Sequence, residues 1–418
     1  MKTLTLLSLC ASLTLASAPS LSTSPVPGTS GASKPPTAAP VPLADKDVSC
    51  EARARSNPAD FAAELCAAMS LDEKIAQMVM SYPPLDKTGP VTVGAVIMLG
   101  PLLKSAETLR TRVENLQSRA EIPLLVAVDM EGGQLNRLQF VPALREAPSG
   151  RALGQMTPAA AEAWGRTLGG QMKALGLNCN LGPVLDLADK GHMFDRERSM
   201  GADAKRVSEV AAAYVRGMRS QGVIGIGKHF PGYGDVDQNS DRELVHSARP
   251  REEIRRQAEP FFALGGELGG VLLTNIAFEA QGGVPAILAK EIVAMAHARE
   301  PNWVTMTDDI AVAPLRQVTG GDAEEVVRRA FHAGNDILLT TAPIDWDKGI
   351  DLRRIIREEV ARDPSLVRRV DASVLRILGL KERMGLLDEL KARQRSGRQQ
   401  VRPREKPQTP PTAAAEPS

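Results

Sequence analysis

Residues 124–133 read Leu-Leu-Val-Ala-Val-Asp-Met-Glu-Gly-Gly. Its first five residues are apolar and partly β-branched, which predicts a short strand. Asp129 and Glu131 follow at once, so the strand ends in acidic side chains. A strand whose carboxyl end carries polar groups is typical of parallel sheets that hold a site at that end.

The same pattern recurs along the chain, with helical periodicity between the apolar runs, for example over 159–175 and 204–221. This alternation predicts a parallel sheet, and it favours a closed (β/α)8 barrel of TIM type in a single domain over an open doubly wound sheet. No glycine-rich nucleotide motif opens a helix. The predicted strands lie at 93–99, 124–128, 184–187, 223–226, 271–274, 304–307 and 337–340.

Composition excludes some partners and indicates export. Apolar residues make up 43% and charged residues 24% of the 418, and the net charge of +1 gives no footprint for nucleic acid. Residues 1–18 have the layout of a signal peptide, too short for an integral membrane span. We therefore expect an exported protein, periplasmic or extracellular. Leu9 before Cys10 disfavours lipidation.

The predicted organisation follows from composition. The signal peptide precedes a disordered tether rich in Pro, Ser and Thr over 19–45, the barrel occupies 46–390, and a disordered basic and Pro-rich tail covers 391–418. In an exported protein Cys50 and Cys66 could pair and leave Cys179 as a buried thiol, but the sequence leaves this pairing open. No cysteine and histidine cluster has metal-ligand spacing, so no metal site is predicted.

Polar side chains at four strand ends predict one site. Asp129, Asp186, the pair Lys228-His229 and the pair Asp308-Asp309 each follow an apolar run. In a barrel these ends converge on one face, so residues far apart in the chain would share a pocket. A carboxylate nucleophile with a separate proton donor is what retaining glycoside hydrolysis requires.

Several motifs in order resemble glycoside hydrolase family 3, in its single-domain β-N-acetylhexosaminidase branch. The run 129–137 (DMEGGQLNR) is similar to that branch's DQEGGRVQR segment, and the opening helix at 69–78 and the closing helix at 374–387 also match. The other matching motifs are Gly182-Pro183-Val184-Leu185-Asp186, Glu197-Arg198-Ser199 and Lys228-His229-Phe230-Pro231-Gly232.

The resemblance implies a role for each matching residue. Asp308 corresponds to the nucleophile that forms the glycosyl-enzyme intermediate, and Asp309 to a supporting carboxylate. The substrate would be an N-acetylhexosamine glycoside from peptidoglycan or chitin, and no metal or organic cofactor is implied. The residues that would bind the terminal sugar are Asp129, Arg137, Arg198, Lys228 and His229.

One loop departs from the family pattern. The branch carries KHFPGHG followed by Asp-Ser-His, whose Asp and His form the acid/base dyad, whereas this chain has Asn239 and Asp241 at the dyad positions. Tyr233 replaces the second His of the motif, and Asn275 lies where the family often has another. Asp241 is a candidate general acid or base if its surroundings raise its pKa; otherwise it solvates the loop.

Three functions therefore stay open. The first is an exo-acting retaining β-N-acetylhexosaminidase with an altered acid/base loop. The second is a catalytically silent sugar-binding barrel at the cell envelope. The third is a transferase or phosphorolytic enzyme that uses the same intermediate. The natural aglycone and the oligomeric state are not predicted.

Overall fold

The computed structural model describes residues 49–57, 59–83, 88–343 and 351–400. Its central element is a parallel β-sheet of eight strands. Strands that follow one another along the chain lie side by side in this sheet and pair in parallel. The strands are β1 (Val79–Tyr82), β2 (Ala95–Ile97), β3 (Leu125–Val128), β6 (Cys179–Asn180), β7 (Ile224–Phe230), β9 (Gly270–Leu273), β11 (Val304–Met306) and β12 (Leu338–Pro343).

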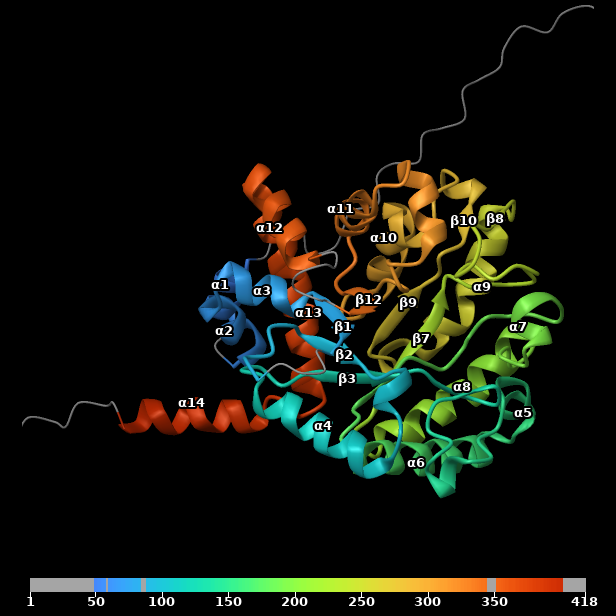
Figure 1. Cartoon of the computed structure of the whole chain (residues 1–418), viewed down its shortest axis with the longest axis horizontal. Coiled ribbons are helices and arrows are strands. Elements are labelled where there is room, and N and C mark those ends of the chain that lie inside the picture. Colours follow the sequence, from blue (N-terminus) through green and yellow to red (C-terminus); the bar gives the residue numbers. More distant parts are fainter. Residues whose placement is uncertain (1–48, 58, 84–87, 344–350, 401–418) are drawn as a thin grey trace, which may run out of the picture. The chain divides into compact units, whose positions relative to one another are not determined.

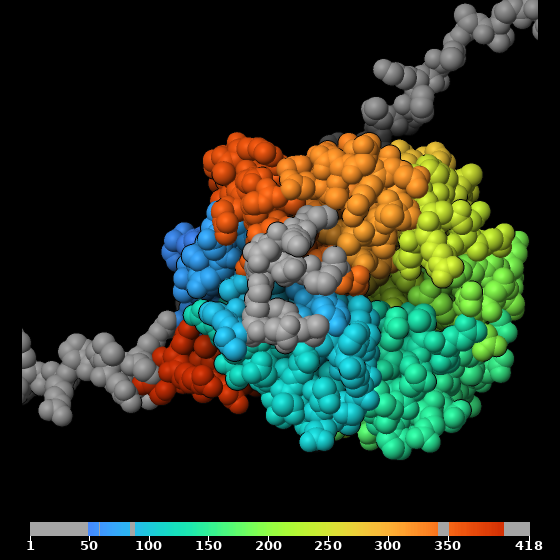
Figure 2. Space-filling view, in the orientation of Figure 1, coloured from blue at the N-terminus to red at the C-terminus, as the bar shows by residue number. Residues whose placement is uncertain are grey.

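The sheet closes into a barrel. β12 pairs with β1, and a parallel bridge joins Met306 of β11 to Ile337 at the start of β12. The backbone N–H of Thr307 also donates to the carbonyl of Ile337 at 3.0 Å. Helices surround these strands in Figure 1. The predicted (β/α)8 barrel is thus confirmed, and Figure 2 shows successive segments following one another around the face from cyan through green and yellow to orange.

Two strand predictions were wrong in detail. The first barrel strand, β1, was missed because it follows helix α3 (Leu71–Gln77) after a single residue and so extends an apolar helical pattern. The strand predicted at 184–187 lies earlier, at β6, and only an isolated bridge from Val184 to Lys228 remains there. Pro183 interrupts the ladder because proline has no N–H to donate.

The helices between the strands include both of the predicted ones, as α6 and α8. Besides α3, the described α-helices are α1 (Cys50–Ser56), α2 (Phe61–Ala68), α4 (Ala106–Ser118), α5 (Gly150–Gln155), α6 (Pro158–Ala174), α7 (Gly191–Asp195), α8 (Ala204–Arg219), α9 (Arg251–Leu264), α10 (Lys290–Arg299), α11 (Ala323–Ala333), α12 (Leu352–Arg362), α13 (Val367–Arg383) and α14 (Asp388–Gln400). Short 3-10 turns occur at 100–102, 142–144, 265–267, 279–281, 286–288, 313–319 and 364–366. Two further pairs of strands are β4 (Met130–Gly132) with β5 (Leu135–Asn136), and β8 (His246–Ser247) with β10 (Ala277–Phe278).

Local chemistry explains where the first barrel unit begins. Ser70 caps α3 with a capping box: its hydroxyl accepts from the N–H of Glu73, and the Glu73 carboxylate accepts from the N–H of Ser70 at 2.6 Å. Ile75 on this helix is fully buried in the core. The predicted opening helix is thus present, and its cap defines its start.

Helices α6 and α8 pack backbone to backbone, side by side in Figure 1. A Cβ atom built on Gly165 would lie 2.1 Å from the Tyr214 carbonyl, and one on Gly217 would lie 2.2 Å from the Glu162 carbonyl. Only glycine permits so close an approach at these two positions.

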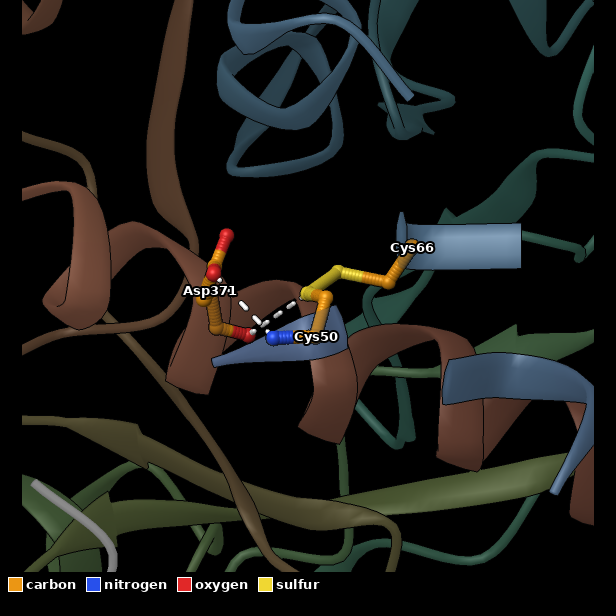
Figure 3. Close-up of side chains that lie close together, drawn as sticks. All are labelled: Cys50, Cys66 and Asp371. Atoms are coloured by element: carbon orange, nitrogen blue, oxygen red, sulfur yellow. Dashed lines mark hydrogen bonds between the residues drawn. A yellow bond between two sulfur atoms is a disulfide. The ribbon is translucent and has the colours of Figure 1, made fainter. Parts of the chain in front are cut away.

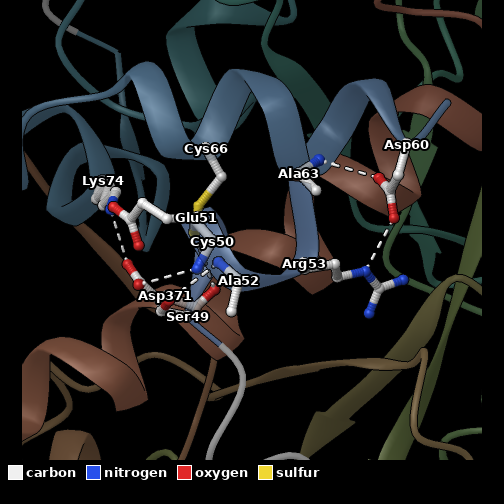
Figure 4. The surroundings of a disulfide bond; sticks show 10 residues. All are labelled: Ser49, Cys50, Glu51, Ala52, Arg53, Asp60, Ala63, Cys66, Lys74 and Asp371. Carbon is white, nitrogen blue, oxygen red and sulfur yellow. Dashed lines mark hydrogen bonds and ion pairs between the residues drawn. A yellow bond between two sulfur atoms is a disulfide. The ribbon is translucent and has the colours of Figure 1, made fainter. Parts of the chain in front are cut away.

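A disulfide ties the first helices together. Cys50 and Cys66 are bonded, with their Cα atoms 5.5 Å apart (Figure 3), whereas Cys179 is a free buried thiol. Asp371 on α13 accepts from the Cys50 N–H at 3.1 Å and from Lys74 at 2.8 Å (Figure 4). The carboxylate of Asp371 and the two sulfur atoms lie together, but the bonded cysteines offer no thiolate to a metal.

The predicted boundary of the tail was wrong. α14 continues through residue 400, where we expected disorder from 391, because the segment is rich in the good helix formers Glu, Leu, Lys, Ala, Arg and Gln. The predicted signal peptide and tether, and the tail from 401 onward, lie outside the described residues. Among the helices that are described, none is long and apolar enough to cross a bilayer.

Candidate active site

A cavity of about 630 Å³ opens where the carboxyl ends of the strands meet. The end of β3, the β4–β5 hairpin, α7, the end of β7, the loop 233–243 and the end of β11 supply its lining. All seven predicted site residues line it: Asp129, Arg137, Arg198, Lys228, His229, Asp241 and Asp308.

A network of ion pairs forms one wall. Lys228 Nζ lies 2.7 Å from Asp129 Oδ1 and 2.6 Å from Glu131 Oε1, and Arg198 binds both oxygens of Glu131 at 2.8 and 2.9 Å. Burial of Glu131 favours its neutral form, but Arg198 and Lys228 outweigh that effect and hold its pKa well below the ordinary range. Asp129 keeps 23% of its side chain exposed, toward solvent in the cavity.

His229 is held by a second buried carboxylate. Its Nδ1 lies 2.7 Å from Asp186 Oδ2, while Asp186 Oδ1 accepts from the backbone N–H groups of His229 and Tyr233 at 3.0 and 2.7 Å. This network assigns the ring proton to Nδ1. The other nitrogen, Nε2, lies 3.3 Å from Arg198 Nη2. Both ring nitrogens are therefore engaged by the protein.

Asp308 follows β11 and borders the cavity. Its Oδ1 accepts from the N–H of Asp309 at 2.8 Å. Burial, and then the nearby charge of Asp241, raise the pKa of Asp308 to about 6, against the opposing effect of His229 and Lys228. At neutral pH the group is mostly ionised, as a nucleophile must be.

The adjacent Asp309 is bound within the protein. It accepts from the N–H of Ala311 at 2.9 Å, from the N–H of Thr341 at 3.2 Å and from the Thr341 hydroxyl. These contacts tie the loop after β11 to the last strand. Of these two adjacent carboxylates, Asp308 is the one that lines the cavity.

Tyr233 shapes the loop of residues 233–243, which departs from the family pattern and is called the altered loop below. Its hydroxyl donates to the Gln238 carbonyl and accepts from the Ser240 N–H, both at 2.8 Å. The Asn239 side chain accepts from the N–H of Asp241 at 2.9 Å, and Asp241 itself is exposed at the cavity. Asn239 thus serves as a turn-forming residue here.

Some of the predictions were incomplete. Glu131 was not predicted as a site residue, although it lies in the quoted motif two residues after Asp129 and bridges both basic groups. His192 on α7 also lines the cavity, and no strand-end signal marked it. Asn275 is not among the cavity-lining residues; it is buried, and its amide atoms have no hydrogen-bond partner among the described residues.

Comparisons with known proteins agree with this geometry. The family described as the glycosyl hydrolase family 3 N-terminal domain matches residues 70–380. A β-hexosaminidase of Pseudomonas aeruginosa strain LESB58 is 32% identical over 221 residues, which cover 51% of this chain and 65% of that protein. A β-hexosaminidase of Tolumonas auensis is 31% identical over 258 residues, which cover 59% of this chain and 75% of that protein.

Solved structures give the same result. The crystal structure of a β-N-acetylhexosaminidase from Beutenbergia cavernae is similar with a TM-score of 0.68 at 26% identity, covering 76% of this chain and 99% of that one. A family 3 β-N-acetylglucosaminidase from Paenibacillus has a TM-score of 0.66 at 25% identity, covering 76% of this chain and 63% of that one. The match to the Pseudomonas relative spans just under two thirds of that protein's length.

Proposed function

The chain belongs to glycosyl hydrolase family 3, and from this premise we propose that it is a retaining, exo-acting β-N-acetylhexosaminidase. It removes a terminal N-acetylhexosamine, N-acetylglucosamine first of all, from peptidoglycan- or chitin-derived glycosides. The β-hexosaminidase relatives and the similarity to the Beutenbergia structure support this assignment.

We assign sugar binding to the wall of the cavity that the ion-paired residues Asp129, Glu131, Arg198 and Lys228 form. Asp129 and Lys228 present a carboxylate and an ammonium group side by side at the cavity, so they can accept from and donate to neighbouring hydroxyl groups of one pyranose ring. Arg198 and His229 extend this surface, and exposed Arg137 borders it. The fixed pairs orient these groups before substrate arrives, which lowers the entropy cost of binding.

The observation that carries the proposal is the position of Asp308. Asp308 lines the cavity and has a pKa of about 6. Its carboxylate accepts a hydrogen bond from the backbone N–H of Asp309. Its carboxylate attacks the anomeric carbon, an ester to the sugar forms as the aglycone leaves, and water then hydrolyses the ester. The proposed reaction requires no cofactor. Asp241 of the altered loop borders the same cavity as Asp308.

Covalent trapping tests this mechanism. A fluorinated N-acetylhexosaminide that forms the intermediate but hydrolyses it slowly should label the protein, and peptide mapping should place the sugar on Asp308. The variant Asp309→Asn, which keeps Asp308, should still be labelled. A label on Asp309, or none on a protein that turns over aryl glycosides, would contradict the proposed nucleophile.

The silent sugar-binding barrel is a second candidate, favoured by Asn239 and Asp241 at the dyad positions. Calorimetry separates the two: binding of N-acetylglucosamine without turnover of any aryl N-acetyl-β-glucosaminide supports the silent barrel. We also propose that the protein acts outside the cytoplasm. The signal-like layout of residues 1–18 and the Cys50–Cys66 disulfide support this location.

A further inference from the structure

The proposed function requires a proton donor at the cavity, and the identity of that group rests on the proposed function. A sugar leaving group departs as a poor alkoxide unless it is protonated in the transition state. The donor must border the cavity, exchange a proton with the substrate, and have ring or carboxyl atoms that no other protein group already engages.

Most titratable groups around the cavity fail one of these conditions. Asp129 and Glu131 are each engaged in an ion pair with Lys228. Both nitrogens of His229 are engaged, by Asp186 and by Arg198. The protein already engages these groups, so they are suited to binding or orienting the sugar.

The altered loop also lacks a good donor. The Tyr233 hydroxyl already donates to Gln238, and burial raises the pKa of Tyr233, so it releases its proton poorly. Asp237, Asp241 and Glu243 line the cavity but are exposed to solvent. Imidazole is the side chain whose charge ordinarily changes near neutral pH, so a histidine at the cavity is the better candidate.

His192 meets the conditions. It is half-buried on α7, it lines the same cavity as Asp241 and Asp308, and its ring lies 6.0 Å from the Tyr233 ring, centroid to centroid. Neither of its ring nitrogens hydrogen bonds to another described residue, so both are free to meet a ligand.

The backbone places His192 against the altered loop. Its N–H donates to the Val236 carbonyl at 2.7 Å. The preceding Gly191 has a positive φ of 74°, and a Cβ atom there would lie 2.7 Å from the same carbonyl. Glycine at 191 therefore lets the loop approach α7 closely, and this contact holds the imidazole near Asp241.

The surrounding charges tune this imidazole. Burial and the cations Arg198 and Arg196 lower the pKa of His192, Asp241 acts in the opposite direction, and His229 adds to the lowering. Asp241 is thus the anion among these groups that stabilises the imidazolium.

We propose that His192 is the general acid and base of this site, paired with Asp241 from the neighbouring loop. The imidazolium gives its proton to the glycosidic oxygen as the bond from that oxygen to the anomeric carbon breaks and the Asp308 ester forms. The aglycone leaves as an alcohol. The neutral imidazole then takes a proton from the attacking water, and Asp308 is released as a carboxylate.

Two glycosides of different leaving-group quality test the role of His192. In His192→Gln, kcat/KM for N,N'-diacetylchitobiose should fall by at least about 100-fold, while that for a dinitrophenyl N-acetyl-β-glucosaminide should change by less than about 5-fold. His332→Gln, a histidine on α11 paired with Glu359, is the matched control and should change neither. The fall of wild-type disaccharide kcat/KM at high pH should disappear in His192→Gln.

Azide gives a readout that a structural role would not produce. In His192→Gln, azide should attack the accumulated intermediate and yield the β-glycosyl azide, which wild type and His332→Gln should not form. Equal losses on both glycosides, or an unchanged disaccharide rate, would overturn the role of His192. If wild type cleaves neither glycoside, the proposed function itself is overturned. If wild type is active, Asp308→Asn should abolish both activities.

Discussion

At the scale of single residues, two nearby carboxylates divide the work according to their surroundings. Asp308 borders the cavity with a raised pKa, whereas Asp309 is engaged by backbone and hydroxyl donors. Glu131 is the opposite case, because two cations keep it ionised despite burial. Under the proposed function, the environment of each group decides which carboxylate attacks and which ones bind or support.

The raised pKa of Asp308 predicts an acid limb in the activity. Protonated Asp308 cannot attack, so kcat/KM for a dinitrophenyl glycoside should rise with pH through about 6. In Asp241→Asn the neighbouring charge is gone, the pKa of Asp308 falls, and the limb should move to lower pH. Asp237→Asn, which removes another carboxylate of the same loop, should move it less. A limb that stays in place in Asp241→Asn would contradict the coupling.

At the scale of elements, the contact between α6 and α8 depends on missing side chains. Gly165 and Gly217 each face a backbone carbonyl of the other helix at a distance that no Cβ atom tolerates. Gly170, on the same helix as Gly165, has only the end of the Gln221 side chain nearby, at 3.8 Å from a built Cβ atom. α8 also packs against β7, the strand that carries His229 to the cavity.

Gly217→Ala should therefore lower the free energy of unfolding by about 1–3 kcal/mol, because the two helices must move apart. Gly170→Ala is the control and should leave stability unchanged or raise it by up to about 1 kcal/mol, since alanine favours the helix. Denaturant unfolding measures both. Equal effects of the two substitutions would show that the close packing of the helices does not matter.

At the scale of the whole molecule, the beginning of the described chain is joined to its closing helix. The Cys50–Cys66 disulfide holds α1 to α2, and Asp371 of α13 binds both the Cys50 N–H and Lys74 of α3. These contacts join residues that precede the first barrel strand, β1, to a residue that follows the last one, β12, and β1 and β12 pair with each other. The N-terminal helices thus contribute to the closure of the barrel.

Removing the disulfide should lower stability without changing the site. The double variant Cys50→Ala and Cys66→Ala should lose about 2–4 kcal/mol of unfolding free energy, because the cross-link restricts the unfolded chain. Reductant should lower the Tm of wild type to near that of the variant and leave the variant unchanged. Identical Tm values for the oxidised wild type and the variant would contradict a stabilising disulfide.

The amino-acid sequence predicted the barrel and seven of the nineteen residues that line the cavity. Buried parallel strands are short apolar runs, and the groups that follow them converge wherever such a sheet closes, so Asp129, Lys228, His229 and Asp308 could be named in advance. The same pattern did not reveal β1, which one residue separates from a helix, and it placed one strand beyond Pro183. The helix to residue 400 was also missed, because the polar composition of that segment suggested disorder.

The pairing of the site residues could be read only from the folded protein. Glu131 bridges Lys228 and Arg198, and His192 meets the altered loop through Val236. No periodicity or residue spacing in the sequence indicates either contact. Residues from different loops become neighbours only when the barrel has closed and those loops have packed against one another, so these pairs follow from the packing of the whole domain.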